Sequence, residues 1–460
     1  MGFKQKEKGR RLKLILIVIV CVGLLGSGGW LVWAKFEGSA PRIAMDLDKR
    51  MLGAETEISG TIRDNRSGVR KIWVGLIQDG SETVLLEETF EAPAGPEQQA
   101  RPFTVSINTR KLGLEDGEAT LRMAAWDHSW RDWGKGNRRY IEKEIVFDTR
   151  APDVTVLTRQ HNIKPGGSGL VAYRLSEDCG KSGIHVGDAF FPGYSGYFSD
   201  DAVYLAFFAL PHDQGKDAQI YVEAVDAAGN SGRGGLHYYI GEKRFKHDVL
   251  RVSDGFLRRK LPEFTPVIDT PADASLIEKF RYVNEKLRKK NNQTLLAHGD
   301  STEAKLNWRG AFGRLPNSAR RASFADHRRY QYKGDTVDRA IHMGVDLASV
   351  QHAPVPAANA GRVAFAGEIG IYGNTLLIDH GYGLFSVYSH LSRFAVAAGD
   401  RVEKGEIIGN TGVSGMAGGD HLHFGMFIDH VYVNPVEWWD PAWVENNITA
   451  KLNRVKSLIE

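Results

Sequence analysis

The sequence predicts a mainly β protein: one transmembrane helix, two β-sandwiches, a short helical connector and a C-terminal antiparallel β-sheet domain. Three observations predict this order. An uncharged run follows a basic N-terminus, the next two hundred or so residues hold short β-branched runs between Gly, Asp and Asn turns, and the last third is rich in glycine between short Val, Ile and Leu runs. The expected segments are 1–13 (cytoplasmic basic segment), 14–34 (transmembrane anchor), 41–149 and 150–241 (β-sandwiches), 242–304 (connector), 305–440 (C-terminal domain) and 441–460 (tail).

Composition sets broad limits on the kind of protein. A chain of 460 residues has room for about three domains, and 42% hydrophobic with 25% charged residues is ordinary for globular proteins. The net charge of +3 is too small to indicate a nucleic-acid partner. The two cysteines do not indicate a disulfide framework, because Cys21 lies in the apolar run. Cys179 is expected to be a free thiol.

The N-terminal run from Leu14 to Ala34 has 21 residues, enough to cross a hydrocarbon core of about 30 Å. Trp30 and Trp33 fall at its far end, where interfacial aromatic residues belong. A cleaved signal peptide is the alternative, but the run is long and lacks a clean Ala-x-Ala site. Basic residues before the run predict a cytoplasmic N-terminus; they are Lys4, Lys6, Lys8, Arg10, Arg11 and Lys13. Everything after Lys35 is therefore expected outside the cytoplasmic membrane.

A weak internal repeat divides residues 41–241 into two modules. Residues 64–69 correspond to residues 181–184, and residues 119–127 correspond to residues 218–226. We therefore expect two sandwiches of about a hundred residues each, which serve for spacing and docking.

The end of the second repeat copy, Ala-x-Asp-x-Ala-Gly-Asn, resembles bacterial immunoglobulin-like repeats, and residues 148–152 look like a junction between two such modules. The first module lacks the Ala-Gly-Asn and carries Trp126, Trp130 and Trp133 instead. Core and turn packing is the expected role of these tryptophans, and a glycan-binding platform is the alternative.

The connector is predicted to contain one amphipathic helix. Ser275 and Glu278 form a capping-box pattern, and the helix is expected to end at about Lys290. An apolar stripe at helical spacing would pack on the C-terminal domain or its neighbour; its residues are Leu276, Phe280, Val283 and Leu287. The basic residues of the other face are expected to be solvated, with an anionic wall polymer or lipid headgroup as the alternative.

Three histidine-bearing clusters indicate a metal site. They are His342-Met343-Gly344-Val345-Asp346, Tyr388-Ser389-His390-Leu391 and His421-Leu422-His423-Phe424. Catalytic zinc takes three protein ligands and leaves a fourth position for water. His342 and Asp346 supply an imidazole and a carboxylate four residues apart, and Gly344 between them favours a turn or irregular strand over a helix.

Strand geometry then suggests which histidines lie together. Residues two apart in a strand face the same side, so His421 and His423 are expected to share a face, and His390 is expected to share one with Tyr388. One of His421 and His423 would complete the ligand set, and two histidines would remain for proton transfer. Spacing alone leaves open which of the pair is the ligand.

The motifs resemble those of the lysostaphin/LytM-type zinc metalloendopeptidases, which cut peptide cross-links in bacterial cell walls. That family has His-x-x-x-Asp, a later single His after Tyr-x, and a closing His-x-His. The likeness covers about residues 305–440, and its one small departure is at His352, near where many members have Gly-Thr before Pro-Val. It continues between the motifs in Ala360-Gly361-Arg362-Val363, Tyr372-Gly373-Asn374, Ile378-Asp379-His380-Gly381 and Gly405-Glu406-Ile407-Ile408-Gly409.

The resemblance implies one zinc ion per catalytic domain. It implies His342, Asp346 and His423 as the metal ligands, with His390 and His421 as the catalytic histidines. Isolated histidines such as His380 are expected to be structural.

With the anchor, the resemblance implies a single-pass protein of the cytoplasmic membrane whose C-terminal domains lie on the periplasmic or extracellular side. It would cleave peptide cross-links of peptidoglycan through zinc-activated water. The implied partners are peptidoglycan stem peptides, the membrane through residues 14–34, and cell-division or wall-synthesis proteins, with no nucleic acid. Two other functions are weighed against it: a catalytically silent LytM-like scaffold that activates a cell-wall amidase, and a wall-binding adhesion protein dominated by the sandwiches.

Overall fold

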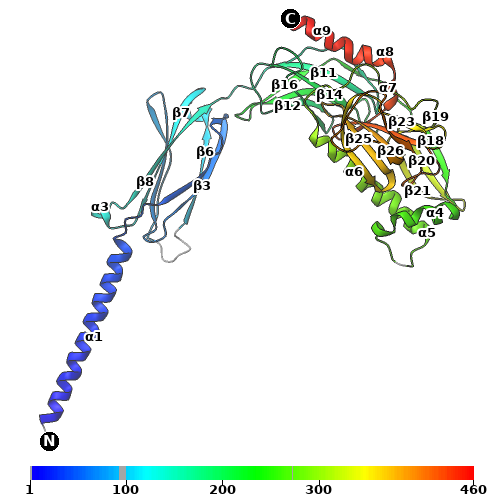
Figure 1. Ribbon diagram of the computed structural model, residues 1–460. Helices are drawn as coiled ribbons and strands as arrows, with labels where there is room; N and C mark the ends of the chain where they lie inside the picture. The colour runs from blue at the N-terminus through cyan, green and yellow to red at the C-terminus, as the bar shows by residue number, and fades with distance from the viewer. Residues whose placement is uncertain (1–2, 93–99, 272) are drawn as a thin grey trace. The chain divides into compact units, whose positions relative to one another are not determined.

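The structure, a computed structural model, describes residues 3–92, 100–271 and 273–460 (Figure 1). Parts of three expected segments fall outside the described residues: 1–2 of the basic segment, 93–99 of the first sandwich and 272 of the connector. The chain divides into an N-terminal unit, residues 1–151 with 227–230, and a C-terminal unit, residues 152–226 with 231–460.

Helix α1 (Phe3–Lys35) covers the apolar run predicted from the sequence. Its residues 13–30 are apolar enough to cross a membrane, and no other helix among the described residues meets that condition. None of this window is buried within the protein, so its apolar side chains are free to face lipid. One N-terminal helix of this kind fits either a membrane anchor or a signal sequence.

The rest of the N-terminal unit is a sandwich of two sheets. Its strands are β1 (Arg42–Asp46), β2 (Met51–Leu52), β3 (Glu55–Arg63), β4 (Val69–Gln78), β5 (Ser81–Thr89), β6 (Ala100–Asn108), β7 (Gly117–Asp127) and β8 (Arg138–Phe147), with short helices α2 (Thr109–Leu112) and α3 (Arg131–Gly134). One sheet has the order β1-β3-β6 and the other β2-β8-β7-β4-β5. Ile58 and Phe103 from the first sheet and Ile72 and Leu121 from the second are buried in one core.

A second set of sheets opens the C-terminal unit. Its strands are β9 (Val154–Val156), β10 (His161–Ile163), β11 (Ser168–Leu175), β12 (Lys181–Val186), β13 (Ala189–Pro192), β14 (Val203–Ala209), β15 (Ile220–Val225), β16 (Ser231–Gly235) and β17 (Tyr238–Ile240). The sheets have the orders β14-β11-β9 and β13-β12-β15-β16, and β10 pairs with β17. The strand-rich chain confirms the mainly β prediction, while the immunoglobulin-like character of the sandwiches stays a prediction.

The internal repeat has a structural counterpart. Strand β4 pairs antiparallel with β7, with Val69 opposite Asp127. Strand β12 pairs antiparallel with β15, with Lys181 opposite Val225. In both modules the second repeated segment lies on one strand, and the first lies on the neighbouring strand or leads into it.

The three tryptophans of the first module have different environments. Trp126 is half-buried on β7, Trp130 is 44% exposed and Trp133 is fully exposed. Because Trp133 is fully exposed, it is not packed in the core, and the packing prediction is wrong for that residue.

The connector begins with a strand and continues as helices. Its elements are β18 (His247–Arg251), α4 (Asp254–Lys260), a 3₁₀ segment (Leu261–Val267), α5 (Leu276–Tyr282), a π-helical turn (Val283–Leu287), α6 (Arg288–Leu296) and a 3₁₀ segment (Ala297–Ser301). The capping box is confirmed: the Ser275 hydroxyl accepts from the Glu278 amide, and the Glu278 carboxylate accepts from the Ser275 amide. The helical stretch runs on to Leu296 rather than ending near Lys290, and β18 and α4 were not predicted.

The apolar stripe of the connector helices packs inward as predicted. Phe280, Val283 and Leu287 are all buried. The ring of Phe280 lies 5.3 Å from that of Tyr330, a residue of the C-terminal domain. The connector is therefore a wall of that domain.

The C-terminal domain is built on a largely antiparallel sheet. Its elements are β19 (Ala319–Ala322), β20 (Asp326–Tyr332), β21 (Asp335–His342), β22 (Val345–Ala348), β23 (Pro354–Pro356), β24 (Gly361–Ile369), a 3₁₀ turn (Gly370–Tyr372), β25 (Gly373–Asp379), β26 (Leu384–Phe394), β27 (Arg401–Val402), β28 (Ile407–Thr411), β29 (Leu422–Ile428), β30 (Val431–Val433), α7 (Pro435–Trp439), α8 (Pro441–Val444), a π-helical turn (Glu445–Thr449) and α9 (Ala450–Ile459). The main sheet has the order β19-β22-β29-β26-β25-β24-β27, and a second sheet has the order β18-β20-β21, in which β18 runs parallel to β20.

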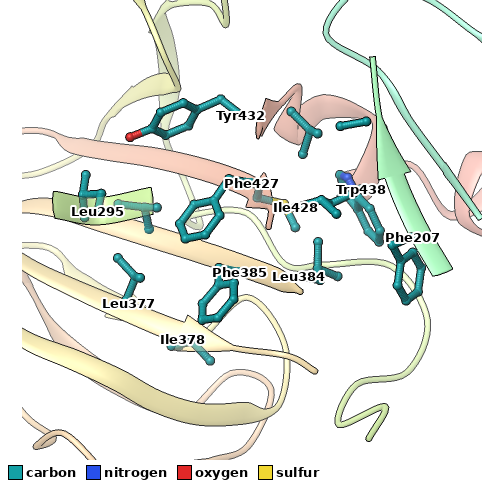
Figure 2. Close-up of a cluster of buried hydrophobic side chains, with 14 of the residues drawn as sticks. Phe207, Leu295, Leu377, Ile378, Leu384, Phe385, Phe427, Ile428, Tyr432 and Trp438 are labelled. Atoms are coloured by element: carbon teal, nitrogen blue, oxygen red, sulfur yellow. The ribbon is translucent and has the colours of Figure 1, made fainter. Parts of the chain in front are cut away.

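The core of this domain continues into the second sandwich (Figure 2). Phe385 of β26 stacks on Phe427 of β29 with ring centroids 4.8 Å apart, and Leu295 of α6 lies at one end of the cluster. At the other end Trp438 of α7 lies 6.1 Å from Phe207 of β14. Because Phe207 belongs to the second sandwich, the two parts of the C-terminal unit share one hydrophobic core.

Asp429 is a buried acid in the turn between β29 and β30, and it makes stability depend on pH. It is 5% exposed, and burial, helped by Asp300, raises the pKa of its carboxyl to about 8. The folded state therefore binds more protons than the unfolded state above pH ~4, so its stability falls as pH rises from about 4 to 8.

We expect Asp429→Asn to remove this penalty, since asparagine tolerates the positive φ of 49° at this position. Unfolding by urea at pH 8 should show a gain of about 1–3 kcal/mol, and the gain should vanish at pH 4. Asp335→Asn, at an exposed acid of β21, is the matched control. An equal effect of Asp429→Asn at both pH values would contradict the prediction.

Candidate metal centre

Strand pairing brings three of the predicted site residues together. His342 is the last residue of β21, Asp346 lies on β22 and His423 lies on β29. β22 and β29 are antiparallel neighbours in which Asp346 stands directly opposite His423. Directly opposed residues of an antiparallel pair carry their side chains on the same face, so the carboxylate and the imidazole meet there.

Three donor atoms form a nearly equilateral triangle at this point. His342 Nε2 lies 2.9 Å from Asp346 Oδ1 and 2.9 Å from His423 Nδ1, and His423 Nδ1 lies 2.9 Å from Asp346 Oδ1. The other ring nitrogen of His342, Nδ1, lies 3.0 Å from the Ser323 carbonyl oxygen and donates its proton there. In the neutral imidazole, Nε2 of His342 then carries the lone pair, which is available to a cation held between the three donor atoms.

The electrostatics favour the protonation states that a metal needs. Burial lowers the pKa of His423 to about 4, so the imidazole is neutral at pH 7. Burial acts to raise the pKa of Asp346, but its interactions with His342, His421 and His423 outweigh this effect and hold that pKa well below the usual range. Two imidazoles and one carboxylate are a donor set that catalytic zinc uses. His342, Asp346 and His423 could hold a metal ion.

Gly344 gives His423 the space that it occupies. A Cβ atom at this position would lie 2.6 Å from the His423 ring and 2.8 Å from the Phe424 carbonyl oxygen, closer than real Cβ contacts come. The glycine between His342 and Asp346 therefore allows His423 to approach closely, and it also permits the turn.

Arg328 holds the second oxygen of the Asp346 carboxylate. Its Nη2 donates to Asp346 Oδ2 over 2.8 Å, which leaves Oδ1 for the donor triangle. Arg328 was not identified as a site residue from the sequence. Its position on β20, two residues after Asp326, which stands opposite His342, is the signal that could have identified it.

The remaining two predicted histidines stand beside the triangle. His421 Nε2 lies 3.6 Å from Asp346 Oδ1, and its Nδ1 lies 2.8 Å from the Gly419 carbonyl oxygen. His390 Nδ1 lies 2.9 Å from the Ser414 carbonyl oxygen, and its ring centroid is 4.8 Å from that of His421. All five predicted site residues are therefore gathered in one place.

One prediction about faces is confirmed and one is wrong. His421 and His423 both reach Asp346 and so share a face. Tyr388 packs on Phe424, on the opposite face of β29 from His423, whereas the ring of His390 lies 5.9 Å from His423. Tyr388 and His390 therefore face opposite sides.

The reason is a local break in the strand. His390 has φ +63°, a left-handed conformation that interrupts the alternation of side chains, and the register of β26 is irregular next to it. Side chains held in such conformations are common at functional sites.

The five residues line a cleft of about 400 Å³, with Tyr372 and Met416 among the other side chains of its wall. His380, by contrast, is fully buried and has both ring nitrogens bonded, to the Ala360 carbonyl oxygen and the Ser386 hydroxyl. It is structural, as predicted.

Residues 340–435 match Peptidase family M23. The chain carries an M23 peptidase domain. Over 96 residues it is 43% identical to the DD-carboxypeptidase/endopeptidase Mpg of Neisseria meningitidis serogroup B, covering 21% of this chain and 22% of that protein. Over 127 residues it is 32% identical to the peptidoglycan DD-endopeptidase ShyC of Vibrio cholerae serotype O1, covering 27% and 29%. The chain thus spans less than a third of the length of either relative.

A solved structure is also similar to the M23 domain. It is the catalytic domain of the antimicrobial peptidase lysostaphin from Staphylococcus simulans, at 27% identity and a TM-score of 0.24, covering 28% of this chain and 98% of that one. The family match and the named relatives confirm the resemblance to lysostaphin/LytM-type peptidases that the motifs indicated.

The donor triangle predicts which substitutions remove the metal. His342→Ala should weaken zinc binding by more than about 100-fold, because it deletes a direct donor. His390→Ala should leave zinc bound, because His390 is outside the triangle. Bound zinc per chain, measured by elemental mass spectrometry after dialysis against a weak chelator, checks both. Equal zinc loss in the two variants would contradict the assignment.

Proposed function

We propose that this protein is a membrane-anchored zinc metalloendopeptidase that hydrolyses peptide cross-links of bacterial peptidoglycan. The observation that carries the proposal is the triangle of His342, Asp346 and His423 beside His390 and His421 in an M23 domain. Both named relatives are endopeptidases by name, and one is named for peptidoglycan.

His342, Asp346 and His423 would hold the zinc. A zinc ion bound there would polarise the scissile carbonyl and lower the pKa of a bound water to about 7. Arg328 keeps the Asp346 carboxylate in one orientation by binding Oδ2, and the Ser323 carbonyl fixes the tautomer of His342. These contacts hold the donor atoms in place before any ligand arrives.

His390 and His421 are placed to handle protons. Each donates Nδ1–H to a carbonyl oxygen, of Ser414 or Gly419, which fixes the ring and makes Nε2 the acceptor nitrogen when the imidazole is neutral. A neutral Nε2 can accept a proton from the attacking water, and a protonated one can donate to the oxyanion or the leaving amine. Both rings line the same cleft as the donor triangle.

The anchor would place this chemistry at the wall. The basic segment before α1 favours a cytoplasmic N-terminus, which leaves the sandwiches and the M23 domain on the periplasmic or extracellular side. Residues 14–34 would then act as a single-pass anchor rather than a cleaved signal.

The decisive experiment incubates the detergent-solubilised, zinc-loaded full chain with purified peptidoglycan and reads the products by mass spectrometry. We expect new peptide ends that disappear with a chelator and return with added zinc. No amidase is added, so products also exclude the silent scaffold. Absence of any product from zinc-containing protein would contradict the proposal.

Histidine variants test the roles beside the metal. His421→Ala should lower kcat by roughly 10²–10⁴-fold while zinc stays bound, because it removes a proton-transfer group but not a ligand. His430→Ala, at an exposed histidine paired with Asp300, should keep wild-type turnover. Wild-type kcat in His421→Ala would show that His421 has no part in catalysis.

A further inference from the structure

The cleft has one wall that lies outside the segment that matches the family. The residue that follows β18 and the connector helices contribute Val252, Phe256, Phe280 and Arg288 to its lining. These residues precede the M23 match, which begins at residue 340. Part of the surroundings of the donor triangle therefore lies outside the matched segment. The wall that the connector forms is a place where substrate preference can be set.

The charged side chains of the cleft are mostly cationic. The arginines that line it are Arg251, Arg288, Arg321 and Arg328, and the acids among the described lining residues are Asp248 and Asp346. Both acids already have cationic partners: Lys246 Nζ lies 2.5 Å from Asp248 Oδ1, and Arg328 binds Asp346. Arg251, Arg288 and Arg321 are thus not neutralised by the acids of the cleft.

Two of the arginines are held in place. Arg288 donates from Nε and Nη2 to Asn284 Oδ1 at 3.1 and 2.7 Å, and the Asn284 amide in turn donates to Asp338 Oδ2 over 2.7 Å. The direct partner of Arg288 is a neutral amide, so this contact orients the guanidinium group without neutralising its positive charge. Arg328 binds Asp346 through Nη2, and its buried Nε has no hydrogen-bond partner among the described residues.

The other two arginines have no anion to bind. Within the part of the chain that the structure describes, the side chains of Arg251 and Arg321 make no ion pair or hydrogen bond, and both are exposed. Arg321 lies in a bulge of β19, where the register shifts between Arg320 and Ala322. A bulge redirects a side chain, and here Ala322, the next residue, stands opposite the ligand strand at Asp346.

We infer that Arg251, Arg288 and Arg321, here called the arginine rim, bind free carboxylates of the peptide substrate. The inference rests on the proposed function and specifies its substrate class: peptides that carry free carboxylates, in preference to the same peptides with those groups amidated or to neutral glycine bridges. Guanidinium groups bind carboxylates in a planar, bidentate fashion, and three cationic groups around one cleft raise the local concentration of an anionic substrate.

The apolar part of the wall fits the same class of substrate. Val252, Phe256 and Phe280 line the cleft together with Arg288, so an aliphatic side chain that ends in a carboxylate would find apolar contact along its stem and a guanidinium at its tip.

The test uses two synthetic cross-linked peptides of the same sequence, one with free carboxylates and one with those carboxylates amidated. The zinc-loaded full chain should cleave the free form with a kcat/KM at least about tenfold higher, and mostly through KM, since the rim binds substrate and takes no part in bond breaking. The preference should shrink as salt is raised from 50 to 500 mM, because screening weakens exposed charge pairs.

Neighbouring arginines give matched variants. Arg321→Ala and Arg251→Ala should each reduce kcat/KM for the free peptide by roughly tenfold and leave that for the amidated peptide unchanged. Arg321→Lys should restore part of the loss. Arg320→Ala carries the same change of charge one residue away, at an exposed position that does not line the cleft, and should have no effect.

Direct binding separates the two proposals. The affinities of both peptides are measured with the zinc-loaded His421→Ala variant, because a binding measurement does not require the peptides to be cleaved. Preference for the free peptide in binding, lost in an added Arg321→Ala change, supports the rim even if wall cleavage fails. Equal binding and equal cleavage of the two peptides by the wild-type rim would overturn the inference and leave the peptidase proposal intact.

Discussion

The antiparallel pairing of β22 with β29 is the constraint on which the centre depends. It sets Asp346 opposite His423, and it brings the end of β21 with His342 to the same face. A slip of one residue in this register would turn every side chain of β22 to the other face. The buried partners Val345 and Phe424, which stand opposite each other on the apolar face, make such a slip costly. The hydrophobic core therefore fixes the register, and the register assembles the donor atoms.

Contacts around the ligands complete what the register begins. Arg328 donates a hydrogen bond to one oxygen of Asp346, and the Ser323 carbonyl oxygen accepts one from His342 Nδ1. Gly344 leaves room for His423. Each contact takes away an alternative orientation that a ligand could adopt. A centre arranged in this way loses little freedom when an ion enters, which is the physical basis of high affinity.

The sequence was most informative where short-range geometry decides the structure. The spacing of His342 and Asp346 and of His421 and His423 singled out residues that the structure brings together, and the capping box at Ser275 located a helix start. Alternation failed at His390, because one left-handed residue reverses the face and nothing in the side chain reveals it.

The sequence pattern could not predict contacts between residues that lie far apart in the chain. Arg251, Arg288 and Arg321 lie on a strand, a helix and a bulge that only the fold brings to one cleft. Arg251 and Arg321 were therefore not singled out from the sequence, and Arg288 fell among the basic residues that were expected to be solvated. The shared core of Phe207 and Trp438 was equally invisible, since it joins residues more than two hundred positions apart.

That shared core has a consequence for how this chain can be divided. A cut between the second sandwich and the M23 domain would strip β14 from the apolar surface around Trp438 and leave large aromatic side chains facing water. The smallest portion that can be transplanted or recombined intact therefore begins near residue 152, ahead of the second sandwich. Insertions and gene fusions should be tolerated near residue 152 and selected against between the second sandwich and the M23 domain. These two parts should therefore be inherited together as one unit.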